Sequence, residues 1–92
     1  MATVYLPTPL RRYANGQSKV QVDGATVGDV LHNLDTSYPG LKERLYDENG
    51  EIKRFIQVFV NEEDVRGLQG NATPVEARDE ISIVPAMAGG RG

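Results

Sequence analysis

The feature that most constrains the fold is a single helical repeat set among segments that alternate with the period of a β-strand. Val27, Val30, Leu31, Leu34 and Tyr38 fall on one face of a helix at about 100° per residue. Because one amphipathic helix cannot bury its apolar stripe alone, it needs an apolar sheet face to cover it. The sequence therefore predicts a two-layer domain with one main helix packed on a sheet.

Local signals mark the boundaries of this helix. Thr26 is placed to cap the first turn, and Asp29, three residues later, matches a capping box in which Asp replaces the usual Glu or Gln. Pro39-Gly40 ends the repeat. Leu41 and Leu45 are four residues apart, which predicts one further helical turn before a polar turn.

Four segments have the alternation or the β-branched content of strands, and they are residues 3–6, 19–23, 55–60 and 81–84. Asn15-Gly16 between the first two predicts a hairpin, and Pro85 ends the last strand because proline cannot donate to a sheet ladder. Val65-Arg66 is a candidate short strand, and residues 67–71 predict a flexible connection.

The alternation divides the strand residues between two faces of the sheet. The face toward the helix is predicted to carry Val4, Leu6, Ile56, Val58, Val60, Ile81 and Ile83. The other face is predicted to carry Tyr5, Gln57, Phe59, Ser82 and Val84. This is an α+β arrangement of the β-grasp (ubiquitin-like) kind, with a mixed sheet of about four to five strands and no element covering its outer face.

Composition limits the organisation and the partners of the chain. Its 92 residues are enough for one domain, which we place at 1–85, followed by a flexible tail at 86–92. The net charge of -3, with both signs interspersed, argues against nucleic acid as a partner, and no apolar run approaches the ~20 residues of a membrane span. No secretory signal is visible, so a cytoplasmic location is expected. Cysteine is absent, so any sulfur chemistry must use sulfur from elsewhere.

Residues for autonomous catalysis are scarce. His32, the only histidine, lies about 140° from the apolar stripe and is interpreted as a solvated surface residue. Glu62-Glu63-Asp64 lacks the ligand spacing of a calcium loop and is interpreted as a solvated turn, and residues 67–70 lack the lysine of a phosphate loop. We therefore expect no catalytic residue, no bound cofactor and no metal site, in a chain that is not an enzyme.

The chain ends in Pro85-Ala86-Met87-Ala88-Gly89-Gly90-Arg91-Gly92, and terminal glycines alone are commonly just disordered ends. Here the glycine pair has a proline four residues before it, and this proline follows an Ile-x-Ile strand. Earlier in the chain come three further motifs, which are Gly24-x-Thr26-Val27, Tyr38-Pro39-Gly40-Leu41 and the 54–66 block. With these motifs the chain resembles the ThiS/MoaD family of ubiquitin-like sulfur carrier proteins, most of all its CysO-type branch. It departs from the family at residues 77–80, where an Asp-Gly-Asp turn is common, and in the two residues after Gly90.

The resemblance implies that an E1-like adenylyltransferase/sulfurtransferase joins the Gly90 carboxylate to AMP from ATP, and that sulfur then replaces AMP to leave a thiocarboxylate. Ala88, Gly89 and Gly90 would enter the partner's active site, after a metalloprotease has removed Arg91-Gly92. Gly92 is the minority alternative for the attachment point. The sulfur acceptor would be a PLP-dependent cysteine synthase or a ThiG-like enzyme, with thiamine thiazole, molybdopterin or a sulfur-containing secondary metabolite as alternative destinations.

Phe59 and Val84, joined by Tyr5, form the predicted docking patch for the adenylating partner on the uncovered sheet face. Scattered surface apolar residues are the alternative interpretation. Two other function classes remain open at this point. One is a ubiquitin-like protein modifier that forms isopeptide bonds with lysines, and the other is a β-grasp binding module with an inert tail.

Overall fold

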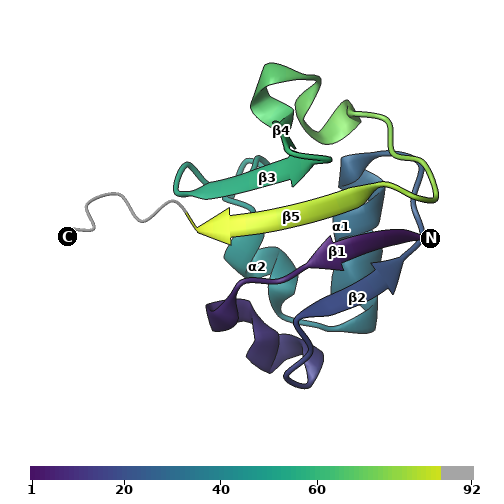
Figure 1. Ribbon diagram of the computed structural model, residues 1–92. Helices are drawn as coiled ribbons and strands as arrows, with labels where there is room; N and C mark the ends of the chain where they lie inside the picture. The colour runs from purple at the N-terminus through teal and green to yellow at the C-terminus, as the bar shows by residue number, and fades with distance from the viewer. Residues whose placement is uncertain (86–92) are drawn as a thin grey trace.

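The computed structural model describes residues 1–85 of the 92-residue chain (Figure 1). In chain order its elements are β1 (Ala2–Tyr5), η1 (Thr8–Ala14), β2 (Lys19–Val22), α1 (Val27–Ser37), α2 (Leu41–Leu45), β3 (Ile56–Val60), β4 (Glu63–Asp64), η2 (Val65–Gly67), η3 (Gly70–Ala72) and β5 (Glu80–Pro85), where η marks a 3₁₀ helix.

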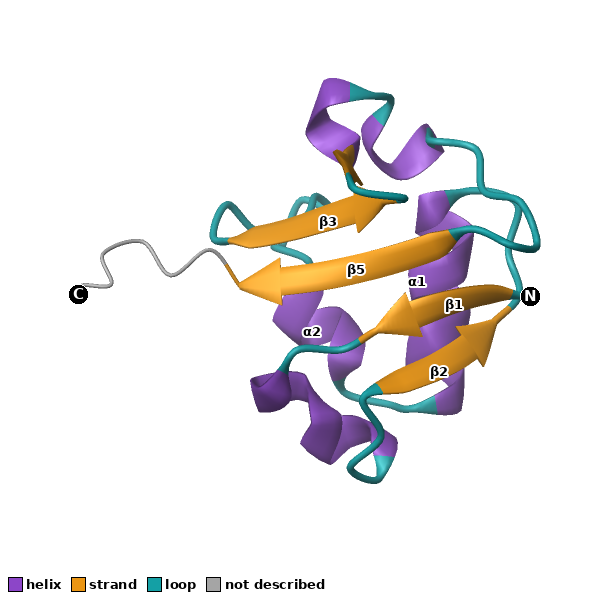
Figure 2. Ribbon diagram, viewed as in Figure 1, coloured by secondary structure: helices purple, strands orange, loops and turns teal. Residues whose placement is uncertain are grey.

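One five-stranded sheet has the strand order β2-β1-β5-β3-β4. β1 and β5 run parallel, whereas the other neighbours are antiparallel, so the sheet is mixed as predicted. Both α-helices lie behind the same face of this sheet (Figure 2). The α+β, β-grasp prediction is therefore confirmed. The last strand, β5, is the central one, so its C-terminal end lies between neighbouring strands on both sides.

The core lies between the sheet and α1. All seven strand residues predicted to face the helix are buried, and Val4 and Ile81 are wholly inaccessible to solvent. Leu31 and Leu34 of α1 and Leu41 of α2 are also fully buried. Each such side chain contributes about 1.5–3 kcal/mol through burial. The outer sheet face is partly open, as the alternation predicts.

The start of α1 depends on a cap and on a glycine. The Thr26 hydroxyl accepts a hydrogen bond from the Asp29 amide at 3.2 Å, which confirms the predicted cap. A Cβ at Gly24 would lie 2.5 Å from Val30 Cγ2 and 2.7 Å from Val30 N. Only glycine therefore lets the chain pass this close to the first turn of the helix.

The corner between α1 and α2 also requires a glycine. Gly40 has φ 106°, and a Cβ there would lie 3.1 Å from the Tyr13 ring. The Asp35 carboxylate accepts hydrogen bonds from the Gly40 amide at 3.2 Å and the Lys42 amide at 2.9 Å. The end of the first helix thus holds the start of the second, and the predicted extra turn around Leu41 is confirmed.

The connection between β3 and β5 differs from the prediction. The fourth strand is Glu63–Asp64 and not Val65-Arg66, because the Asp64 carboxylate accepts the Arg66 amide at 2.8 Å and starts η2. Of the predicted solvated turn at 62–64, only Glu62 lies outside the sheet. The predicted flexible connection is instead built from η2 and η3, and the Gln69 amide is held by the Thr73 hydroxyl at 3.1 Å.

The prediction also lacked η1, which separates the two strands of the first hairpin. Pro9 lies in its first turn, where a missing amide hydrogen removes no helical bond. The predicted turn at Asn15-Gly16 follows it, with both residues at positive φ. Within residues 1–85, none of the helices is long and apolar enough to cross a membrane.

Candidate functional site

The outer sheet face carries one row of residues that crosses all five strands. In register, Lys19, Tyr5, Ser82, Phe59 and Asp64 stand beside one another in that order. The two aromatic residues therefore flank Ser82, two strand spacings or about 10 Å apart. Charged residues of opposite sign stand at the two ends of the row.

Val84 lies on the same face as this row, two residues nearer to the end of β5. It pairs directly with Gln57, and it stands two residues after Ser82, so it is the diagonal neighbour of Phe59. Its side chain is 39% exposed. Phe59 and Val84 thus lie on one face, with Val84 one residue before the end of β5 and Phe59 beside Ser82, further from that end.

Tyr5 is turned toward the opposite end of the strands. Its hydroxyl donates a hydrogen bond to Glu80 Oε2 at 3.3 Å, and Glu80 precedes Ser82 on β5. The charge of the Glu80 carboxylate, with a smaller effect of burial, raises the pKa of Tyr5 because the phenolate would be a second negative charge beside it. The structure therefore joins Phe59 and Val84 more closely to each other than to Tyr5.

The tail leaves the sheet beside Pro85, whose neighbour on β3 is Ile56. The predicted attachment residue Gly90, its alternative Gly92, and the inserted residues Ala88 and Gly89 all lie outside the described residues. Residues 1–85 nevertheless define the surroundings of the tail exit. The turn before β3 and the 3₁₀ helix η1 lie on the two sides of the end of β5 (Figure 1).

Phe55 is a candidate residue at this exit that the sequence analysis placed inside the third strand. The strand begins one residue later, and the Phe55 side chain is 54% exposed. Lys53 Nζ lies 5.7 Å from the centroid of its ring. The signal available in the sequence was the basic pair Lys53-Arg54 directly before an aromatic residue.

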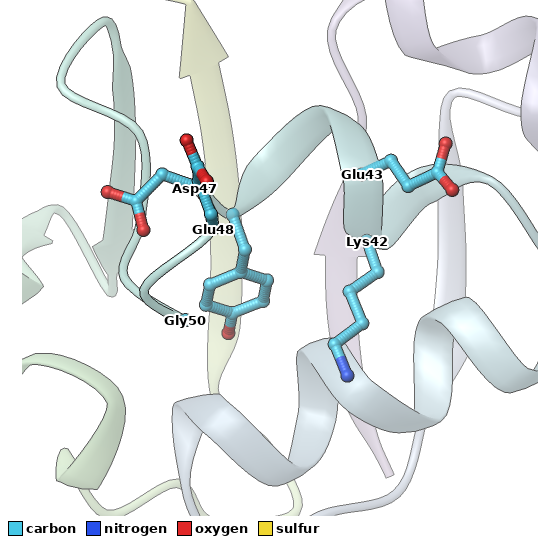
Figure 3. A pocket seen from close by; sticks show the side chains of 6 residues that line it. Lys42, Glu43, Asp47, Glu48 and Gly50 are labelled. Carbon is cyan, nitrogen blue, oxygen red and sulfur yellow. The ribbon is translucent and has the colours of Figure 1, made fainter.

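A hollow on the helix side of the molecule has a structural role. Figure 3 shows its rim, where Lys42 and Glu43 point in different directions from α2. The Tyr46 hydroxyl donates to Asn71 Oδ1 at 3.0 Å, and burial raises the pKa of Tyr46 to about 12. At neutral pH this phenol is a fixed, neutral donor that ties α2 to η3.

Other groups with catalytic potential are dispersed over the described part of the chain. His32 is exposed on α1, as predicted from its helical position. Asp79 accepts the Glu76 amide at 2.8 Å and the Asn61 side-chain amide at 2.9 Å, and these hydrogen bonds lower its pKa. Among residues 1–85, no three His, Asp or Glu side chains are grouped as a metal site would need.

Comparison with known proteins covers nearly the whole chain. The profile of the ThiS family matches residues 4–90. The sulfur carrier protein CysO of Mycobacterium tuberculosis is 43% identical over 90 residues, covering 96% of this chain and 97% of that protein. The small archaeal modifier protein 3 of Haloferax volcanii is 46% identical over 68 residues, covering 74% and 73% of the two chains.

Solved structures agree with the sequence comparison. A chain in the crystal structure of the Amycolatopsis orientalis BexX/CysO complex superposes with a TM-score of 0.90 at 38% identity, and the match covers 94% of this chain and 96% of that one. The match to the family profile includes the glycine pair at 89–90. The chain is thus a member of the ThiS family.

Proposed function

We propose that this chain is a sulfur carrier protein whose Gly90, once it is the C-terminal residue, is converted to a thiocarboxylate, chiefly for cysteine biosynthesis. The observation that carries the proposal is the near full-length similarity to a relative named a sulfur carrier protein, CysO, at 43% identity. The family profile ends at residue 90, which favours Gly90 over Gly92 as the reactive terminus. The fold supports it because β5, the strand that ends at Pro85 just before this segment, is the central strand of the sheet.

The proposed chemistry has two steps, and both take place in the partner. The Gly90 carboxylate attacks the α-phosphorus of ATP, which forms an acyl-adenylate and releases pyrophosphate. Hydrosulfide then attacks the acyl carbon, the bond to AMP breaks, and a thiocarboxylate, AMP and a proton remain. Glycine suits both steps because a chain without Cβ passes a narrow channel and leaves the carboxylate unhindered.

The carrier contributes binding energy and not catalysis. Ordering the tail inside a partner opposes binding by ~1 to 2 kcal/mol per residue, so contacts of the folded domain must offset this. Phe59 and Val84 on the outer face are the proposed main contacts with the E1-like enzyme, and Tyr5 lies at their margin. ATP is consumed by that enzyme, and a sulfur-accepting synthase, either a PLP-dependent cysteine synthase or a ThiG-like enzyme, receives the sulfur.

Arg91-Gly92 must be removed before Gly90 can react, and we assign this step to a metalloprotease. The intact mass of the protein isolated from its host tests this assignment. A mass that ends at Gly90 supports it. Full-length chains that carry sulfur on Gly92 would move the reactive carboxylate to that residue.

The function is tested with three purified chains that end at Gly92, Gly90 and Ala88. Each is incubated with ATP, a sulfide source and the host's E1-like enzyme, and its mass is then measured. We expect only the Gly90-ended chain to exchange one oxygen for sulfur. If that chain stays unmodified beside an E1-like enzyme that is active on another carrier, the proposal is wrong.

A second candidate function has its own supporting observation, the similarity to small archaeal modifier protein 3. A modifier would use the same activated glycine to form isopeptide bonds with target lysines. Tagged protein in host extract would then give conjugates that survive a reducing agent. Their absence beside thiocarboxylate formation leaves the carrier function alone.

A further inference from the structure

Charge is segregated along the strands although the whole chain has a net charge of -3. Residues 53–54 precede β3, and the first residue of β3 pairs with the last residue of β5. Because β1 runs parallel to β5, η1, which follows β1, lies at this same end of the sheet. Arg11, Arg12, Lys53 and Arg54 therefore surround the tail exit. At the other end of the sheet lie Glu62, Glu63, Glu76, Asp79 and Glu80.

The cations at the exit have neutral neighbours that do not cancel their charge. Arg11 Nε donates to the Leu6 carbonyl at 3.0 Å, the Arg12 guanidinium lies 5.8 Å from the centroid of a tyrosine ring, and Lys53 lies over Phe55. Arg54 is exposed. Such contacts hold the side chains in place and leave their positive potential directed at solvent.

The nearest acidic turn, residues 47–51, is directed elsewhere. The carbonyl of Gly50 at its tip accepts from Asn71 Nδ2 at 3.5 Å, and the same glycine lines a hollow together with His32 of α1. Within the turn, the Asp47 carboxylate accepts hydrogen bonds from the Asn49 amide at 2.8 Å and the Glu51 amide at 3.1 Å. Glu51 lines a second hollow together with Arg66 and Asn71.

We propose that Arg11, Arg12, Lys53, Arg54 and Phe55 form a tail-exit collar that docks on an acidic protein surface, the rim of the active site that receives the tail. This inference rests on the proposed function and adds the chemistry of the partner. A second docking surface results, distinct from the outer-face pair of Phe59 and Val84. Phe55 is its apolar anchor, and the four cations supply orientation.

The length of the tail favours this occupant. Residues 86–90 span at most ~17 Å when fully extended, so the collar must approach the rim whenever Gly90 reaches a buried reaction centre. A molecule with one basic and one acidic end also turns in the field of an acidic partner. The tail then leads the encounter, and the acidic far end points away.

The collar is tested by the association rate of the Gly90-ended chain with its E1-like enzyme, measured by stopped flow at low and high salt. Arg54→Gln and Arg78→Gln are matched variants, because both residues are exposed and both changes give the same net charge. Arg78 lies at the acidic end. We expect Arg54→Gln to slow association ~2- to 3-fold at low salt, and the double change with Arg12→Gln to slow it ~5- to 10-fold. High salt should abolish these differences.

The anchor has its own matched pair. Phe55→Ala should raise the dissociation rate ~10-fold, whereas Leu68→Ala, which removes an apolar side chain that is 41% exposed elsewhere, should leave it unchanged. Melting temperatures of all variants check that the fold is intact.

Equal rates for Arg54→Gln and Arg78→Gln, differences that persist at high salt, or tighter binding to a single-stranded oligonucleotide than to the enzyme would each overturn the collar. Thiocarboxylate formation separates this failure from that of the proposed function. If sulfur is still loaded on Gly90 while the charge variants behave alike, only the collar is wrong. If no sulfur is loaded and no complex forms with the wild-type chain, both proposals are wrong.

Discussion

Replacing Gly24 by alanine should weaken the fold at the point where the chain enters α1. The added Cβ would lie 2.5 Å from Val30 Cγ2, 2.7 Å from Val30 N and 2.9 Å from Val30 Cα. Two of these three atoms belong to the backbone, so a change of rotamer cannot relieve the overlap. Either the helix start or the 22–24 segment must move.

The expected size of the effect follows from two opposing terms. Overpacking at a well-packed position destabilises by about 1–3 kcal/mol. Alanine also restricts the unfolded chain more than glycine does, which offsets ~0.4–1 kcal/mol of this. The net loss should be ~1–2 kcal/mol, or a fall in the melting temperature of roughly 4–16 °C for a domain of this size.

Gly67→Ala is the matched control, since a Cβ at Gly67 would meet nothing within 4 Å and its φ is not in the left-handed region. This variant should be neutral or more stable by up to ~1 kcal/mol. Both are measured by urea unfolding followed by circular dichroism. Should Gly24→Ala prove as stable as Gly67→Ala, the reasoning from the close approach to Val30 would be refuted.

Three further predictions concern other parts of the molecule. Phe59→Asp should leave the melting temperature within a few degrees but weaken binding to the E1-like enzyme in titration calorimetry, and unchanged affinity would discard the outer-face contact. Glu62→Gly should stabilise the folded state by ~0.5–1 kcal/mol in urea unfolding. Glu62 has φ 76° in the two-residue turn after β3, and glycine adopts this conformation without strain. A loss of stability would contradict this prediction. Tyr46 has its pKa raised to about 12 from 10.0 in the folded state, so its contribution is fully present below pH 10 and is lost as the pH rises toward 12. The loss of unfolding free energy should be ~1 kcal/mol after allowance for partial exposure. Tyr46→Phe should remove this dependence of the unfolding free energy on pH. If the variant and the wild-type protein lose stability equally between pH 10 and about 12, Tyr46 does not titrate in this way.

Much of the fold was predictable because its main signals are local. The helical repeat from Val27 and the cap at Thr26 are short-range patterns, and both appear in the structure as predicted. The division of the strand residues into a buried and an outer face also followed, since a strand exposes alternate residues whatever its partner. The central position of the last strand was not visible in any single segment.

The errors fell where tertiary contacts override weak local signals. η1 and η3 contain no apolar repeat of their own and are held by hydrogen bonds with distant segments, from Arg44 to the Tyr13 hydroxyl of η1 and from the Tyr46 hydroxyl to Asn71 of η3. The strand Glu63–Asp64 has no β-branched residue, and it is a strand only because β3 offers it a free edge. Phe55 looked like part of a strand because an aromatic residue before Ile56 fits the pattern equally well inside or outside the sheet.

The sequence by itself determined the secondary-structure periods, the helix-facing residues of the main strands and the family, because hydrophobic alternation and junction motifs are written along the chain. Only the tertiary structure decided which distant residues share a surface. Arg11 and Arg54 belong to segments on the two sides of the tail exit because β1 pairs in parallel with β5 and β3 pairs antiparallel with it, so that the end of β1 and the start of β3 lie at the same end of the sheet. Charge position therefore depends on strand order, which the sequence encodes only through the packing of the whole domain.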